Sequence, residues 1–133
     1  MLTSLNLIYV MRIFVICSDK LTDLEAVNYG SRAVMKYLRE TEDEGWMNEG
    51  EVIYYRYPAK EMKLHEHFGW TLGNLVFHYI PNYNWYVEGK LVAYCFADCD
   101  VNNEKCYDPM YTDNWEHDRD YLYNELGKLK RIC

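Results

Sequence analysis

Side chains able to bind a metal ion stand together at His65, Glu66 and His67. If this segment were a strand, positions 65 and 67 would share one face, and both imidazoles could reach one ion. His78, a further imidazole eleven residues after His67, would complete the candidate set. One hypothesis is therefore a metal- or small-ligand-binding domain, and possibly an enzyme, that uses His65, His67 and His78.

The His-x-His pattern resembles the opening of the cupin metal motif. That motif has a glutamate four or five residues later, where this chain has Thr71 and Leu72. The alternative is that His65 and His67 are solvated or hydrogen-bonded histidines of a connecting segment. We favour this alternative and expect no cofactor.

Two other segments contain metal-binding side chains but lack the residue spacing of known metal sites. The three cysteines between positions 95 and 106 lack the paired C-x-x-C arrangement of zinc sites. The segment from Asp98 begins like a calcium loop, but its sixth position is Asn103 rather than Gly and its twelfth is Pro109 rather than Glu. Neither segment predicts a metal site.

Cys17 follows an apolar run at a strand-to-helix junction, where a helix N-terminus can lower a thiol pKa. Cysteine phosphatases have an arginine six residues later, and here that position is Asp23, which would repel phosphate. We therefore interpret Cys17 as a buried apolar residue. The chain contains no G-x-G-x-x-G, no G-x-x-x-x-G-K-[ST] and no G-x-S-x-G pattern, so we expect a non-enzymatic protein.

Acidic residues are concentrated in two segments of a chain whose formal net charge is −7. Residues 40–51 carry six acids and no Lys or Arg, and residues 98–125 carry nine acids against one Lys and one Arg. The two segments sum to −6 and −7, so the rest of the chain carries +6. This charge disfavours direct contact with nucleic acid or an anionic membrane and favours a basic protein partner. The alternative is that both segments are solvated surface.

Aromatic residues alternate with the acids of the second segment, and such rings can anchor a contact that carboxylates steer. We predict an acidic inhibitor that occludes a basic, nucleic-acid-binding partner, by analogy with phage-type inhibitors whose surface acids mimic nucleic-acid phosphates. The residues predicted to contact the partner are Asp98, Asp100, Glu104, Tyr107, Asp108, Tyr111, Asp113, Trp115, Glu116 and Asp120. The alternative for Asp113 and Glu116 is that they serve only the N-terminus of a helix.

Composition indicates a folded chain, because 50% of the residues are hydrophobic and 17% are aromatic. A length of 133 residues fits a single domain over 1–133, with residues 1–10 as an N-terminal extension if Met11 is the start. The cysteine count is odd, and we find no secretory signal and no apolar stretch of about 18 residues. We expect a cytoplasmic protein with free thiols.

These side chains must be positioned by a sheet whose central strand is the apolar run Leu7–Cys17. Its apolar residues do not alternate with polar ones, so both of its faces should be covered. A capping box at Thr22 and Glu25 predicts a helix through residue 38, and further strands are expected over 52–57, 75–80, 84–87 and 91–97. A polar loop over 98–111 and a final helix from Asp113 complete the chain.

The expected order β-α-β-β-β-β-α gives an α+β, two-layer sandwich. Its sheet of about five strands should be mainly antiparallel, because short turns join the later strands. We expect both helices on one face and many of the 14 tyrosines on the other. Such an open tyrosine-rich face predicts a homodimer.

Overall fold

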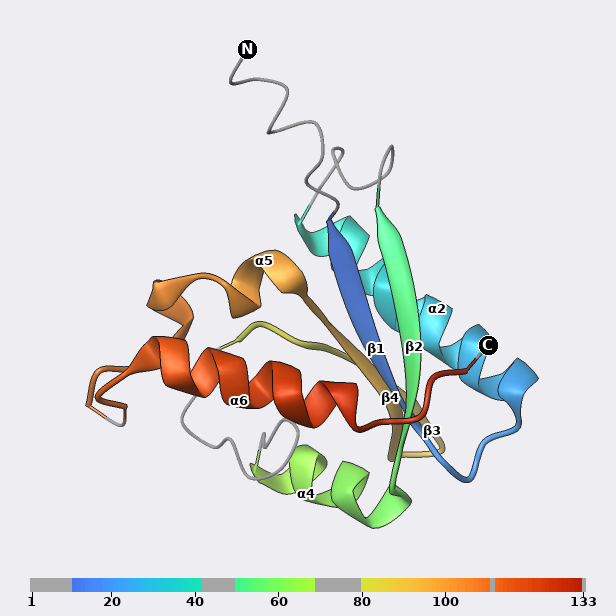
Figure 1. Cartoon of the computed structure of the whole chain (residues 1–133). Helices are drawn as coiled ribbons and strands as arrows, with labels where there is room; N and C mark the ends of the chain where they lie inside the picture. The colour runs from blue at the N-terminus through green and yellow to red at the C-terminus, as the bar shows by residue number, and fades with distance from the viewer. Residues whose placement is uncertain (1–10, 42–49, 69–79, 111, 133) are drawn as a thin grey trace.

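The computed structural model describes residues 11–41, 50–68, 80–110 and 112–132 (Figure 1). In chain order, its elements are β1 (Arg12–Ser18), α2 (Asp23–Thr41), β2 (Glu51–Tyr57), α4 (Ala59–Phe68), β3 (Tyr83–Val87), β4 (Lys90–Ala97), α5 (Asp98–Val101), the 3-10 helix η1 (Glu104–Cys106) and α6 (Trp115–Gly127). Apart from Ile80, the strand expected over 75–80 lies outside the described residues. The loop expected over 98–111 contains α5 and η1.

The described strands form one four-stranded sheet in the order β2-β1-β4-β3. β1 pairs with β2 in parallel, since α2 crosses over between them, while β4 pairs antiparallel with both β1 and β3. The sheet is therefore mixed. The chain end covers the outer edge of β2, where Ile132 N donates to Tyr54 O at 2.9 Å and Arg131 bridges Tyr55.

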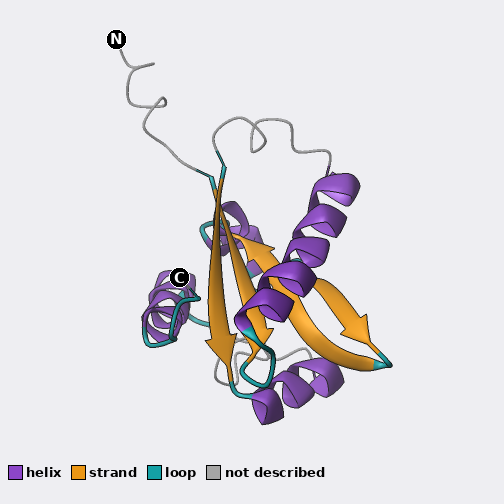
Figure 2. Ribbon diagram, turned by 90° about the vertical axis from the view of Figure 1, so that its right-hand side faces the viewer, coloured by secondary structure: helices purple, strands orange, loops and turns teal. Residues whose placement is uncertain are grey.

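β1 is one of the two inner strands of the described sheet, and it corresponds to the later part of the predicted run Leu7–Cys17, whose residues 7–10 lie outside the described residues. Every side chain from Ile13 to Cys17 is at most 2% exposed, so this strand is buried on both faces. Covering both faces requires helices on both, and Figure 2 shows α2 on one side of the sheet and α6 on the other, with α4 below. The α+β class is confirmed, but the helices lie on both faces rather than on one.

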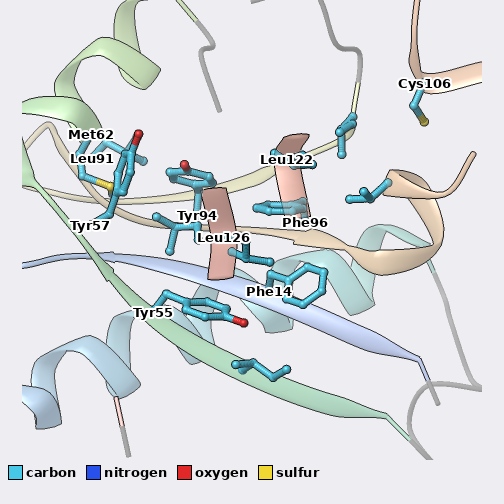
Figure 3. Packing of buried hydrophobic residues seen from close by; sticks show 14 of the residues in the cluster. Phe14, Tyr55, Tyr57, Met62, Leu91, Tyr94, Phe96, Cys106, Leu122 and Leu126 are labelled. Atoms are coloured by element: carbon cyan, nitrogen blue, oxygen red, sulfur yellow. The ribbon is translucent and has the colours of Figure 1, made fainter. Parts of the chain in front are cut away.

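The two faces differ in side-chain size. Under α2 the sheet presents small residues such as Ala93, Cys95 and Ala97. The face under α4 and α6 is aromatic, and Figure 3 shows Phe14, Tyr55, Tyr94 and Phe96 there. The buried tyrosines are Tyr37, Tyr55, Tyr57, Tyr94 and Tyr107. They fill the core, so the open tyrosine-rich face expected to support a homodimer is not found in the described sheet.

The capping box expected at the start of the first helix is confirmed, and two glycines mark further local features. Thr22 and Glu25 form a reciprocal capping box, with backbone-to-side-chain distances of 2.8 and 3.1 Å. The β3–β4 turn has positive φ at both Glu88 (51°) and Gly89 (78°), as a two-residue hairpin requires. Gly30 marks a close approach, because a Cβ there would lie 2.8 Å from Val15 Cγ1.

Candidate functional site

Asp98 is the buried centre of a polar network rather than part of an accessible surface. Its side chain accepts from Arg12 Nε at 3.2 Å and from Arg12 Nη2 at 3.0 Å, and Asp98 is 2% exposed. Tyr123 donates its hydroxyl to the other carboxylate oxygen, which Asn102 Nδ2 approaches at 3.3 Å. Burial, followed by the bond to Asp98, raises the pKa of Tyr123. The network therefore ties β1, α5 and α6 together.

Two aromatic residues predicted as anchors belong to the core or pack against it. Tyr107 is 3% exposed and donates its hydroxyl to Val101 O at 2.7 Å. Trp115 is partly buried, with its ring centroid 5.6 Å from that of Tyr107 and the Arg119 guanidinium 5.0 Å from its own centroid. Tyr107 and Trp115 thus hold α6 against the protein body, which leaves the anchoring of a partner to other side chains.

The N-terminus of α6 is capped by Asn114, one residue after the position expected. The Asn114 side chain accepts from His117 N at 3.2 Å. The Asp113–Glu116 capping box is therefore replaced, and both carboxylates are exposed. Because an amide does the capping, these acids are not consumed by the helix end, although the positive end of the α6 dipole still favours them.

Exposed acids lie on the outward face of α6 and just before its N-terminus. Glu116 and Asp120 are four residues apart on the helix, so they lie on one side of it, and Asp113 precedes the Asn114 cap. Asp120 Oδ1 accepts from Arg119 Nε at 3.1 Å, and the Asp120 side chain remains 69% exposed. Tyr121 lies on this outward side and is 40% exposed. We call Asp113, Glu116, Asp120 and Tyr121 the α6 outer face. Tyr121 was not among the predicted contact residues, because the sequence alone does not show that Tyr121 faces outward while Trp115 packs against the core.

The other predicted contact residues are divided. Glu104 is exposed on η1, while Asp100 and Asp108 are half-buried. Burial raises the pKa of Asp100, and Asp108 Oδ1 accepts from Met110 N at 2.9 Å. Met110 itself is 79% exposed beside these acids. Tyr111 lies outside the described residues, as do positions 42–49 of the first acidic segment.

The histidine hypothesis rested on a strand, and the segment is instead the helix α4. Positions i and i+2 share a face in a strand but not in a helix. His65 is 3% exposed and stacks on Tyr94, with ring centroids 3.9 Å apart, so it is a core residue. His78 lies outside the described residues. No cluster of three potential metal ligands occurs in the part of the chain that the structure describes.

Buried thiols are not nucleophiles in this fold. Cys17 Sγ donates to Ala26 O at 3.5 Å, and burial raises the pKa of Cys17 to about 12. Burial raises the pKa of Cys95 to about 12 as well. A thiol with such a pKa stays protonated near neutral pH, which agrees with the interpretation of Cys17 as an apolar residue.

A cavity of about 720 Å³ lies at the end of the sheet remote from α5. Four of its lining residues are lysines, Lys20, Lys60, Lys63 and Lys90, and Asp19 is the one acid among the lining residues that the structure describes. The sequence does not display this site, because its lysines come from separate segments. The formal charge of +6 outside the two acidic segments indicated only that basic residues prevail there.

Comparison with family models, curated proteins and solved structures gave no match to this chain. Among the described residues, no helix combines the length and the apolar character needed to cross a bilayer.

Proposed function

We propose that this chain is a small acidic binding protein that docks a basic, nucleic-acid-binding protein through the α6 outer face. The observation that carries the proposal is that Asp113, Glu116 and Asp120 are all exposed, while Asn114 caps α6. Exposed carboxylates on a helix and at its N-terminal end match a surface of Lys and Arg that otherwise binds phosphates.

Tyr121 and Met110 replace Tyr107 and Trp115 as the proposed anchors. Both are large side chains with apolar surface, and they are exposed by 40% and 79% respectively. Desolvation of such groups supplies contact energy, while the surrounding acids raise the rate of encounter. Glu104 on η1 extends the negative surface beyond the helix.

The proposed mechanism is occlusion. The carboxylates occupy the cationic side chains of the partner, so nucleic acid and this protein compete for one surface. A cytoplasmic setting forms part of the proposal, and the free thiols of Cys17, Cys95 and Cys106 support it.

The test is affinity capture from the native host with three versions of the chain. Wild type should retain a basic protein that added nucleic acid releases. The triple variant Asp113→Lys, Glu116→Lys and Asp120→Lys should lose it.

The matched control reverses three exposed acids elsewhere, as Glu40→Lys, Glu51→Lys and Glu88→Lys, for the same total change in charge. This control should retain most of the partner. Equal loss from both triple variants, or capture that nucleic acid leaves unchanged, would contradict the proposal.

A further inference from the structure

We propose that the lysine-lined cavity is a binding site for a small phosphorylated ligand. It lies at the carboxyl ends of the parallel strands β1 and β2. The chain leaving β1 turns to α2 on one face, and the chain leaving β2 turns to α4 on the other (Figures 1 and 2). Where adjacent parallel strands send their connections to opposite faces, a crevice forms at the strand ends, and ligands of open sheets bind there.

The positive charge of the cavity is not neutralised from within. In the described part of the chain, Lys20, Lys60, Lys63 and Lys90 make no ion pair within 4.0 Å. The lining acid, Asp19, is engaged at the start of α4, where its Oδ1 accepts from Ala59 N at 3.1 Å. Four clustered cations against one aspartate repel one another, and a bound anion reduces that repulsion.

The walls of the cavity are shaped by fixed backbone and apolar side chains. Lys20 N donates to Ser18 Oγ at 3.3 Å, and Asp19 N donates to Tyr57 O at 2.8 Å, so the loop after β1 is held. Leu21, Pro58 and Val92 add apolar surface.

Val92 reaches this lining through an irregularity in β4. Tyr86 pairs with Leu91 and Trp85 with Ala93, so Val92 is an extra residue in the strand. Leu91 and Ala93 consequently belong to opposite faces of the sheet, although they are two residues apart. Such bulges redirect side chains and are frequent beside binding sites.

The charge and size of the cavity define the ligand class. Four lysines against one aspartate leave a lining charge of +3, which a diphosphate or triphosphate group balances and a single carboxylate does not. Lysine binds phosphate as a point charge. The volume of about 720 Å³ accommodates more than the phosphates, and the apolar wall is suited to a nonpolar body attached to them.

The test is calorimetric titration of the full chain with the sodium salts of ATP and of pyrophosphate, without divalent cations, at about 150 mM NaCl. Both probes should bind saturably with one site, and ATP should bind more tightly because its nucleoside contacts the apolar wall. The double variant Lys60→Gln and Lys63→Gln should weaken both by about tenfold or more. The matched control Lys105→Gln and Lys130→Gln, at exposed lysines outside the cavity, should change affinity by less than about twofold.

Amide chemical shifts recorded during the titration locate the site. They should change for residues 18–21, 58–63 and 90–92. Absence of saturable binding to both probes, an equal loss in the control variant, or shifts confined to other residues would overturn the proposal. Equal affinity for ATP and pyrophosphate would overturn the role given to the apolar wall.

Discussion

The two ends of β4 carry opposite charge. Lys90 begins the strand at the lysine-lined cavity, and Asp98 follows its last residue at the acidic end. With eight residues at about 3.3 Å each, these ends lie about 25 Å apart. The separation exceeds the Debye length of about 8 Å at physiological ionic strength, so each end presents its own field to solvent.

The two ends are also built differently. At the acidic end, the buried Asp98 network fixes α5 and α6, and exposed acids surround it. At the lysine end, the charges are all exposed and the backbone turns beneath them are fixed by hydrogen bonds. Removal of a charge should therefore cost folding stability at Asp98, whereas at the other positions it should alter mainly binding.

The largest expected effect is at Asp98. Asp98→Ala should lower the free energy of unfolding by about 3 kcal/mol, because the Tyr123 hydroxyl loses its acceptor and Arg12 loses its ion-pair partner. Glu116→Ala, which removes an exposed acid nearby, should change it by less than about 0.5 kcal/mol. Urea denaturation measures both. Equal losses of stability in the two variants would contradict the distinction between Asp98 as a structural acid and Glu116 as a surface acid.

The free energy of unfolding should depend on pH in the alkaline range, because β1 and β4, which join the two ends, each hold a buried thiol. Cys17 and Cys95 have folded-state pKa values of about 12, above the ordinary value of 9.0. Below pH 9 both states keep these protons, whereas between pH 9 and 12 only the unfolded state releases them. The free energy of unfolding should therefore fall as pH rises above 9, by about 1.4 kcal/mol per pH unit for each thiol.

Denaturation of wild type and of Cys17→Ala/Cys95→Ala at pH 8, 9 and 10 measures this dependence. Since burial raises the pKa of Tyr107 and Tyr123 as well, the window up to about pH 10 isolates the thiols best. The double variant should show a much flatter profile there. The same slope in both proteins would contradict burial of the two thiols.

A smaller effect on the free energy of unfolding is expected from the β3–β4 turn, which directly precedes Lys90 of the cavity. Glu88 has a φ of 51°, which asparagine tolerates better. Glu88→Asn should therefore raise the free energy of unfolding by about 0.5 to 1 kcal/mol. Glu88→Gln removes the same charge without the conformational benefit and serves as the control. A gain in the Gln variant equal to that of Asn would assign the effect to charge.

The smallest effect is expected from the cavity lysines. Lys60→Gln/Lys63→Gln should leave the free energy of unfolding within about 0.5 kcal/mol of wild type, with a slight gain at low salt from reduced repulsion. Thermal denaturation at two salt concentrations measures it. A large loss of stability would show that these lysines hold the fold rather than a ligand.

Local sequence patterns were sufficient for much of the fold. The non-alternating run at Ile13–Ile16 predicted a strand buried on both faces, and Thr22 with Glu25 predicted the start of α2. The strands expected over 84–87 and 91–97 are found as β3 and β4. These features depend on residues close in sequence, so the chain itself displays them.

Long-range packing decided the rest. Tyrosine suits a half-exposed sheet and a packed core equally well, and Tyr55, Tyr94 and Tyr107 are core residues because α4 and α6 cover this face. The acidic end was predictable because its charges are contiguous in sequence. Asp98 could not be separated from Asp113, however, because its burial depends on Arg12, 86 residues earlier.

The most direct test of the docking proposal is the dissociation constant of the captured partner at about 50 mM and about 300 mM NaCl. We expect the affinity of wild type to fall steeply with salt, and we expect little binding at either concentration for Asp113→Lys/Glu116→Lys/Asp120→Lys. An affinity that salt leaves unchanged, or that the triple variant retains, would contradict the docking proposal.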